Sequence, residues 1–472
     1  MPPNHFSLQI ASRTLIQASA PPPGFPSIHA VSNLDLVLGP FPIYLICLYP
    51  PAPSGLPAVL SAVRAALPGF LSAFFPFAGR VVRDPDTNVP LVACSNAGAE
   101  LVVADAATPL ADLDFAEIDA SLGLIQIPFD GSLPLSLQLV RFACGGFALT
   151  VATNHLLADG RAFVLLLNCF AEMVRTGGGG GLSGGPPRLD RCLLSPRSPP
   201  RYSPSLDAEF ARFTPATMIN PLLTLAIRRR LYRIDAADLA ALQNAASASA
   251  GGRRTSRFVA LCAHVWKLLA RAVGESDPSC RMAWIVDGRK CVGGVGEEEG
   301  GALDRYVGNV VTYTSQEASV GELLATPLHE VAATVRGAIA GVMRKERFQE
   351  LVDWVEEKKA AYKDGGKWTE AVNLGLGSPT LVISGLLPFA IDGDLGGGLG
   401  KPRLVLPWVR HGRLGSAAVT VVPCPGGDGS WFVGGTRLWP RLVEVIEAGP
   451  ESLLKPVTAA SLGFAGAHGS RL

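Results

Sequence analysis

The sequence predicts an α+β protein built as two domains with mixed sheets. Three observations lead to this fold class. With 472 residues, the chain is too long for one ordinary hydrophobic core. Strand-like and helix-like hydrophobic patterns both occur in each half. A glycine- and proline-rich run at 177–187 separates the halves and cannot pack as a regular element. We therefore expect a first domain over 1–176, a crossover linker over 177–220 and a second domain over 221–472.

Composition narrows the classes of protein that the chain can form. Hydrophobic residues make up 48% and charged residues 17%, so large cores can be buried, and a net charge of +1 argues against a general nucleic-acid partner. The nine cysteines are odd in number and form no CxxC pair, which indicates reduced thiols and a cytoplasmic protein. Residues 1–20 lack the pattern of a signal peptide. The charge-free stretch 36–63 contains six prolines, so we expect no membrane span.

Hydrophobic periodicity predicts the elements of the first half. We expect strands at 7–10, 43–48, 91–94, 100–103, 135–142 and 147–153, and helices at 56–74 and 162–174. Pro68 should end or bend the first helix. The 95–99 turn should join its two neighbouring strands as a hairpin, and the turn at 144–146 should do the same for the next pair.

The second half shows the same mixture of patterns. We expect strands at 228–234, 282–286, 310–314, 417–422 and 431–435, and helices at 236–250, 258–273, 330–362 and 442–448. Residues 292–304 are rich in glycine and glutamate and are predicted as a loop. The turn at 425–429 should join the last two strands.

One histidine stands where a buried strand ends. The apolar run from Phe147 to Thr153 leads into Asn154 and His155, and a turn at Ala158-Asp159-Gly160 follows. A histidine held there can reach a cavity and exchange protons near neutral pH, as a general base does. It can equally be a polar cap on the strand end. A metal site is disfavoured, because the strand-to-turn context and the lack of a third nearby ligand do not suit one.

Several motifs accompany this histidine in a fixed order. Pro76-Phe77-Ala78-Gly79-Arg80 comes before it, and Phe258-Val259-Ala260-Leu261-Cys262-Ala263-His264-Val265-Trp266 comes after it. Asp287-Gly288-Arg289 and Tyr306-Val307-Gly308-Asn309 follow. Together with His155-x-x-x-Asp159-Gly160, this set resembles the plant BAHD acyltransferases, which have a chloramphenicol acetyltransferase-like fold. The resemblance extends from about residue 8 to residue 450.

The resemblance carries expectations about fold and function. It implies two similar domains, each a mixed sheet flanked by helices, with a channel between them, in a monomer. It implies that His155 is the general base, that Asp159 orients the turn by pairing with Arg289, and that Asp287 and Arg289 are structural. Acyl-CoA is the implied co-substrate, with no permanently bound cofactor. The expected reaction moves a hydroxycinnamoyl, benzoyl or other aromatic or aliphatic acyl group to a hydroxyl of a plant specialised metabolite. An amine acceptor and an inactive binding protein remain alternatives.

A basic segment precedes the 258–273 helix. Arg253, Arg254 and Arg257 flank Thr255 and Ser256, which can cap the helix. Cations around a helix N-terminus suit the phosphates of CoA, and a solvated basic cap is the alternative. The resemblance favours the CoA interpretation.

Two departures from the family pattern concern the second half. The family's D-F-G-W-G-x-P is replaced by Asp394-Leu395-Gly396-Gly397-Gly398-Leu399-Gly400-Lys401-Pro402, and Asp394 is taken as its first residue. Ending the motif at Gly398 to Pro402 is the alternative alignment. The family treats this loop as structural and distant from the histidine, so its alteration should affect packing more than chemistry.

The second departure lies in the expected acceptor pocket. Ser384 and Leu387 fall in a segment that reads S-W-T-R in many relatives, where the arginine binds a carboxylate. Leu387 replaces that arginine, which favours a neutral, apolar acceptor. Ser384 is expected to contact the substrates and to stabilise an oxyanion.

Overall fold

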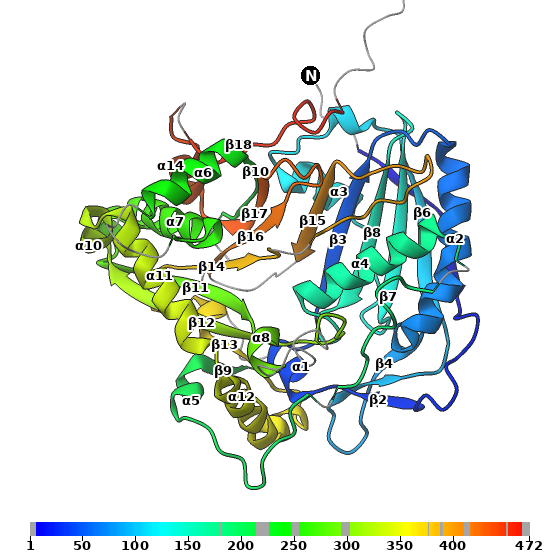
Figure 1. The fold of residues 1–472 in the computed structure, drawn as a ribbon, viewed down its shortest axis with the longest axis horizontal. Helices are drawn as coiled ribbons and strands as arrows, with labels where there is room; N and C mark the ends of the chain where they lie inside the picture. Colours follow the sequence, from blue (N-terminus) through cyan, green and yellow to red (C-terminus); the bar gives the residue numbers. More distant parts are fainter. Residues whose placement is uncertain are drawn as a thin grey trace, which may run out of the picture.

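Two large β-sheets, lying side by side, organise the protein (Figure 1). The computed structural model describes residues 6–178, 181–191, 193–213, 226–247, 254–293, 303–375, 377–387, 390–409, 416–449 and 452–464. Both sheets mix parallel and antiparallel pairs and carry helices. The prediction of a mixed α+β fold with two sheet-containing domains is confirmed.

The first sheet is built from the first half of the chain and one strand of the second. Its six strands, in spatial order, are β1 (Leu8–Ile16), β6 (Ala99–Ala106), β7 (Leu135–Phe142), β8 (Phe147–Asn154), β3 (Pro42–Tyr49) and β15 (Leu404–Val409). β7 and β8 form the expected hairpin. β15 pairs antiparallel with β3, so one strand of the second half completes this sheet.

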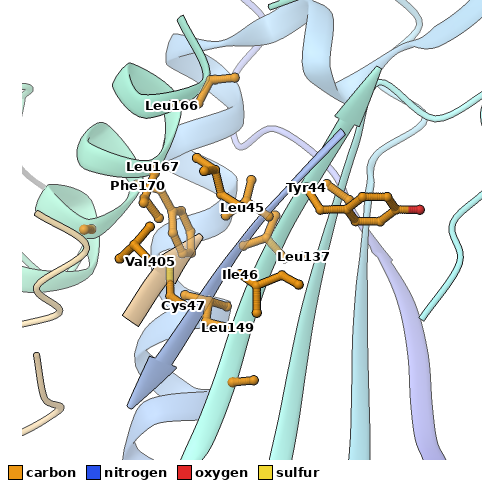
Figure 2. Close-up of a cluster of buried hydrophobic side chains, with 14 of the residues drawn as sticks. Tyr44, Leu45, Ile46, Cys47, Leu137, Leu149, Leu166, Leu167, Phe170 and Val405 are labelled. Carbon is orange, nitrogen blue, oxygen red and sulfur yellow. The ribbon is translucent and has the colours of Figure 1, made fainter. Parts of the chain in front are cut away.

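Helices α2 (Gly55–Ala73) and α4 (Gly160–Arg175) pack against each other beside the first sheet. Figure 2 shows Leu45 and Cys47 of β3 grouped with Phe170 of α4 and Val405 of β15, while Tyr44 points to the other side. This alternation is the two-residue period of a strand. Pro68 lies inside α2, which continues to Ala73. Among the described residues, α2 is the one helix long and apolar enough to cross a membrane, a test that core helices also pass.

The second sheet has seven strands. Their order is β12 (Val311–Ser319), β11 (Ser279–Asp287), β14 (Thr380–Gly385), β16 (Ala417–Pro423), β17 (Trp431–Leu438), β10 (Arg228–Ile234) and β18 (Lys455–Pro456). Its helices, on the outer side in Figure 1, are α6 (Ala236–Ala245), α7 (Arg257–Val273), α10 (Val320–Ala325), α11 (Leu328–Val342) and α14 (Pro440–Glu447). α7 contacts each of the other four, and its buried face supplies the centre of the second hydrophobic cluster.

A third cluster joins the two halves. It contains Leu34, Leu156, Phe348 and Trp354, among others. The shorter elements are β2 (Ile28–Ala30), β4 (Arg80–Arg83), β5 (Pro90–Ala93), β9 (Phe210–Phe213), β13 (Lys367–Glu370), α1 (Asn33–Leu38), α3 (Leu122–Ile125), α5 (Ser205–Glu209), α8 (Arg289–Val292), α12 (Lys345–Lys358) and α13 (Ala371–Leu374). The described residues also form short 3-10 helices at Phe75–Ala78, Leu110–Asp112, Ile118–Ala120, Gly274–Ser276 and Lys359–Tyr362.

The predicted hairpin over 91–103 is wrong. β5 pairs with β2 and β4 in a small sheet, whereas β6 pairs with β1 and β7 in the large one. The 95–99 turn therefore carries the chain from one sheet to another. Asn96 holds it there, with its side chain bonded to the backbone N and O of Ala18 at 2.8 and 3.2 Å.

The predicted helix over 330–362 is also wrong as a single element. It breaks at Met343 and Arg344 into α11 and α12. The two pieces belong to different clusters, since α11 packs on α7 and α12 packs on α1. Hydrophobic periodicity is the same within both pieces, so it does not reveal that they face different cores.

Part of the predicted linker is docked rather than free. Buried Asp353 of α12 accepts hydrogen bonds from the backbone N–H groups of Arg197 and Arg201 at 2.8 and 3.0 Å. β9 of the same segment pairs with β13. Of the predicted loop over 292–304, residues 294–302 lie outside the described residues, as do 248–250 of the predicted 236–250 helix.

Candidate active site

A cavity of about 400 Å³ lies between the two sheets. Both halves of the chain line it. The first half supplies Leu38, Phe41, Ile43, Tyr44, His155, Asp159, Gly160, Arg161 and Phe163. The second half supplies polar side chains that include Asp287, Arg289, Asn373, Glu370, Ser384, Thr420, Thr436 and Arg437, together with apolar ones that include Ile285, Val311, Trp368, Val382, Leu386 and Val409. The cavity can therefore hold an apolar body and bind polar groups at a few points.

His155 enters this cavity from the end of β8. Its backbone N–H donates to the carbonyl of Phe41 at 2.8 Å, and the two rings lie 4.8 Å apart between centroids. Nδ1 is buried without a hydrogen-bond partner among the described residues. Because the ring lines the cavity and Nδ1 is enclosed, Nε2 is the nitrogen available to a substrate.

The environment of His155 favours the neutral ring. Burial is the largest influence and lowers the pKa of His155 below that of free imidazole. Its own backbone carbonyl, Asp159 and Asn309 raise the pKa, but burial outweighs them. A neutral imidazole at physiological pH has a free lone pair, which a general base requires.

The hydrogen bonds of Asp159 go to backbone groups and to Arg289 rather than to the His155 ring. It is the N-cap of α4 and accepts hydrogen bonds from the backbone N–H groups of Ala162 and Val310 at 3.0 and 2.9 Å. Both of its oxygens also bind Arg289, at 2.8 and 3.0 Å. Burial alone would raise the pKa of Asp159, but Arg289 and these hydrogen bonds hold it below its usual range. Asp159 therefore fixes the turn that follows His155.

Arg289 and Asp287 complete this brace, in the arrangement that the resemblance implies. The buried Arg289 guanidinium also donates to the carbonyl of Gly308 at 3.0 Å. Asp287 lies 3.3 Å from Arg289 and 3.7 Å from Arg161. Burial raises the pKa of Asp287 and outweighs the effect of the two arginines.

A second brace, which the sequence did not reveal, holds the other end of the turn. Buried Asp35 pairs with buried Arg191 at 3.0 Å, and Arg191 donates to the carbonyl of Leu157 at 3.1 Å. The Asn309 amide donates to Asp35 at 2.8 Å and to the backbone carbonyl of His155 at 2.9 Å. The Tyr306-to-Asn309 motif marks one part of this brace in the sequence, but the motif does not identify Asp35 as its partner.

Of the two residues expected to contact the substrates, one lines the cavity and the other does not. Ser384 lines the cavity, and its hydroxyl lies 3.3 Å from that of Thr420. Leu387 does not line the cavity and packs against the second hydrophobic cluster, whereas its neighbour Leu386 does line it. The expectation of a neutral acceptor, which rested on Leu387, therefore loses its basis.

The predicted CoA segment lies away from the cavity lining. Ser256 caps α7 by accepting from the Val259 N–H at 3.2 Å, and buried Thr255 donates to the carbonyl of Ala246 at 3.0 Å. Thr255 is thus corrected to a structural residue. Arg254 is exposed and Arg257 is half-buried, while Arg253 lies outside the described residues.

The altered 392–402 loop is held by bonds of its own and by contacts to α4 and β3. Asp394 accepts from the Gly396 N–H at 2.8 Å and pairs with Lys401 at 3.1 Å. The Tyr49 hydroxyl donates to the carbonyl of Gly393 at 2.6 Å. None of the described residues of this loop lines the cavity, so its changed sequence does not reach the His155 site.

The described residues also bear on metal binding and on disulfide formation. They contain no group of three or more His, Cys, Asp or Glu side chains placed to hold a metal ion. All eight cysteines in the described part of the chain are free thiols.

Comparison with known proteins shows which family the chain belongs to. The family model described as "Transferase family" matches residues 6–436. Hydroxycinnamoyltransferase 2 of Oryza sativa subsp. japonica is 30% identical over 79% of this chain and 82% of its own length. Putrescine hydroxycinnamoyltransferase 3 of the same plant is 28% identical, over 81% and 84%. Omega-hydroxypalmitate O-feruloyl transferase of Arabidopsis thaliana is 27% identical, over 71% and 73%.

Solved structures share the fold. Vinorine synthase superposes with a TM-score of 0.67 and 18% identity, covering 95% of this chain and 99% of that one. TRI101 of F. sporotrichioides, complexed with coenzyme A and T-2, superposes with a TM-score of 0.71 and 19% identity, covering 91% and 99%. With a family model matching almost the whole chain and a cavity between two such sheets, the protein belongs to the Transferase family, the BAHD acyl-CoA-dependent acyltransferases.

Proposed function

We propose that the protein transfers an acyl group from a CoA thioester to a hydroxyl of a plant specialised metabolite, with His155 as general base. The observation that carries this proposal is the position of His155: two buried braces hold its turn, and its ring lines a cavity that both sheets enclose. The names of the relatives favour hydroxycinnamoyl groups as the acyl group. We also propose that the protein works in the cytoplasm as a monomer.

The proposed chemistry needs only proton transfer and positioning. Nε2 of His155 takes the proton of the acceptor hydroxyl while its oxygen bonds to the thioester carbonyl carbon. The carbonyl electron pair moves to oxygen and forms a tetrahedral oxyanion, for which the Ser384 hydroxyl is a candidate donor. When the carbonyl re-forms, the C–S bond breaks, and the thiolate takes the proton back from His155. The ester and free CoA are the products, and holding both substrates together lowers the entropic part of the barrier.

An amine acceptor is the second candidate, because carboxylates line the cavity. Besides Asp159, which pairs with Arg289, these are Asp287 and Glu370. However, both already have hydrogen-bonding partners: Arg289 donates its backbone N–H to Asp287 at 2.9 Å, and Asn373 donates to Glu370 at 2.8 Å. A hydroxyl acceptor therefore remains the primary proposal.

The test is release of free CoA thiol over a panel of hydroxycinnamoyl- and benzoyl-CoAs with alcohols and amines. The native protein should release thiol only when donor and alcohol are both present, and His155→Ala should lose this activity. His329→Ala is the matched control, since His329 is a partly exposed residue of α11 outside the cavity lining. Activity that survives in His155→Ala would remove His155 as the base. Release with amines only would replace the ester by an amide.

A further inference from the structure

Arg437 has no assigned role, yet it faces the cavity. It lies near the end of β17, opposite Ala418 of β16. Residues directly opposite each other in an antiparallel pair project from the same face of the sheet. Ala418 lines the cavity, and Arg437 lines it as well. The strand register therefore places this arginine on the cavity face of the second sheet.

The guanidinium of Arg437 is only partly satisfied. Its Nε donates to the carbonyl of Ser416 at 3.0 Å, and Nη2 donates to the Ser416 hydroxyl at 3.2 Å. Nη1 is buried and has no hydrogen-bond partner within the described residues. The residue as a whole is 4% exposed, so bulk water does not replace the missing partner.

The other buried arginines show what is missing. Each of them pairs with a carboxylate: Arg191 with Asp35 at 3.0 Å, Arg289 with Asp159 at 2.8 Å, and Arg347 with Glu209 at 3.0 Å. In the described part of the chain, no carboxylate lies within ion-pair distance of Arg437. A buried charge without a counter-charge is strongly unfavourable, so a ligand that brings a carboxylate here would relieve that cost.

Glu370, an acidic residue of the cavity lining, is separated from Arg437 by other residues. The Ser416 hydroxyl donates to the carbonyl of Asn373 at 3.1 Å, and the Asn373 amide donates to Glu370 at 2.8 Å. Two residues thus stand between Glu370 and the guanidinium. Burial, and then the nearby Arg229, lower the pKa of Arg437 to about 10, so the group still carries its charge at neutral pH.

We infer that the guanidinium of Arg437 binds a carboxylate carried by one of the two substrates. The carboxylate belongs either to the acceptor or to the acyl chain of the CoA thioester. A planar guanidinium that is itself buried suits such a group, because it can form paired hydrogen bonds to a carboxylate away from bulk water. This inference rests on the proposed acyl transfer and specifies the substrate class of the same cavity.

The test compares matched acids and neutral analogues. One arm uses hydroxybenzoates against their methyl esters as acceptors with one hydroxycinnamoyl-CoA. The other arm uses malonyl-CoA against acetyl-CoA with a neutral alcohol. In at least one arm, the kcat/KM of the native protein should be at least 10-fold higher for the carboxylate substrate than for its neutral analogue. Arg437→Gln should bring that ratio close to one, and Arg437→Lys should keep part of it.

Controls keep this result specific. Arg229→Gln removes a charge from the same region without touching the cavity lining, and its ratio should stay at the native value. Circular dichroism and thermal unfolding establish that each variant folds. Titration calorimetry with the hydroxybenzoates, and with malonyl-CoA against acetyl-CoA, tests the carboxylate site even if no thiol is released, which separates it from the proposed reaction. Equal rates and equal binding for acids and neutral analogues, or a ratio unchanged in Arg437→Gln, would overturn the inference.

Discussion

The His155 turn and the 392–402 loop correspond to the two family signatures, and they are held in opposite ways. The turn keeps the family residues, and two buried ion pairs from distant segments hold it. The loop has lost the family's aromatic residues, and each of its two ion pairs includes an exposed side chain: Lys401 bound to Asp394, and Asp392 bound to Arg175 of α4. Buried, convergent bonds tolerate little change, while exposed local bonds tolerate more. Substitutions in the turn should therefore have larger effects than substitutions in the loop.

Loss of Asp159 should have the largest effect. Asp159→Ala leaves the buried Arg289 guanidinium without its main carboxylate partner, which costs about 3–5 kcal/mol of unfolding free energy. The displaced turn should also lower kcat by about 100-fold. Urea unfolding and steady-state kinetics measure the two effects. As a control, Arg441→Ala breaks an exposed pair with Glu444 and should cost less than about 1 kcal/mol. Equal losses of unfolding free energy in the two variants would show that the buried ion pair stabilises the protein no more than the exposed one does.

Loss of Asn309 should have an intermediate effect. Asn309→Ala removes the amide that joins Asp35 to the carbonyl of His155 and leaves buried acceptors unsatisfied. We expect a loss of about 1–3 kcal/mol in unfolding free energy and about a 10-fold drop in kcat. The variant keeps the His155 ring, so substrate binding measured by calorimetry should be nearly native. Native kcat in a folded Asn309→Ala protein would show that the second brace does not position the base.

Loss of Asp394 should have the smallest effect. Asp394→Ala removes an exposed pair and one bond to the Gly396 N–H, which together stabilise the fold by about 1 kcal/mol. Because none of the described loop residues lines the cavity, kcat should stay at the native value below the melting temperature. A large fall in kcat at temperatures where the variant is fully folded would link this loop to the chemistry.

Local sequence predicted those features whose cause is local. The β7–β8 hairpin follows from alternation and a glycine turn. The Asp159–Arg289 pair joins distant residues, and only the family resemblance implied it. Other pairings between distant segments were not predictable. β15 joins β3 from the other half of the chain, and Asp35 of the first domain meets Arg191 of the predicted linker with no local pattern to indicate it.

The position of Arg437 shows a further limit of sequence analysis. A bulge between Ala418 and Val419 shifts the register of β16 against β17. A shift of one residue reverses the face on which every following side chain lies. Periodicity alone therefore could not tell whether Arg437 faces the helices or the cavity.

The pH dependence of kcat/KM tests the central claim, that a neutral His155 is the base. Burial lowers the pKa of His155, so the neutral, active form persists as the pH falls through 6.5 and is lost only below the lowered pKa. We predict a flat profile from neutral pH down through 6.5, with any acid limb below that value. The residual activity of His155→Gln should lack this limb. An acid limb above 6.5, or the same limb in the variant, would contradict the account.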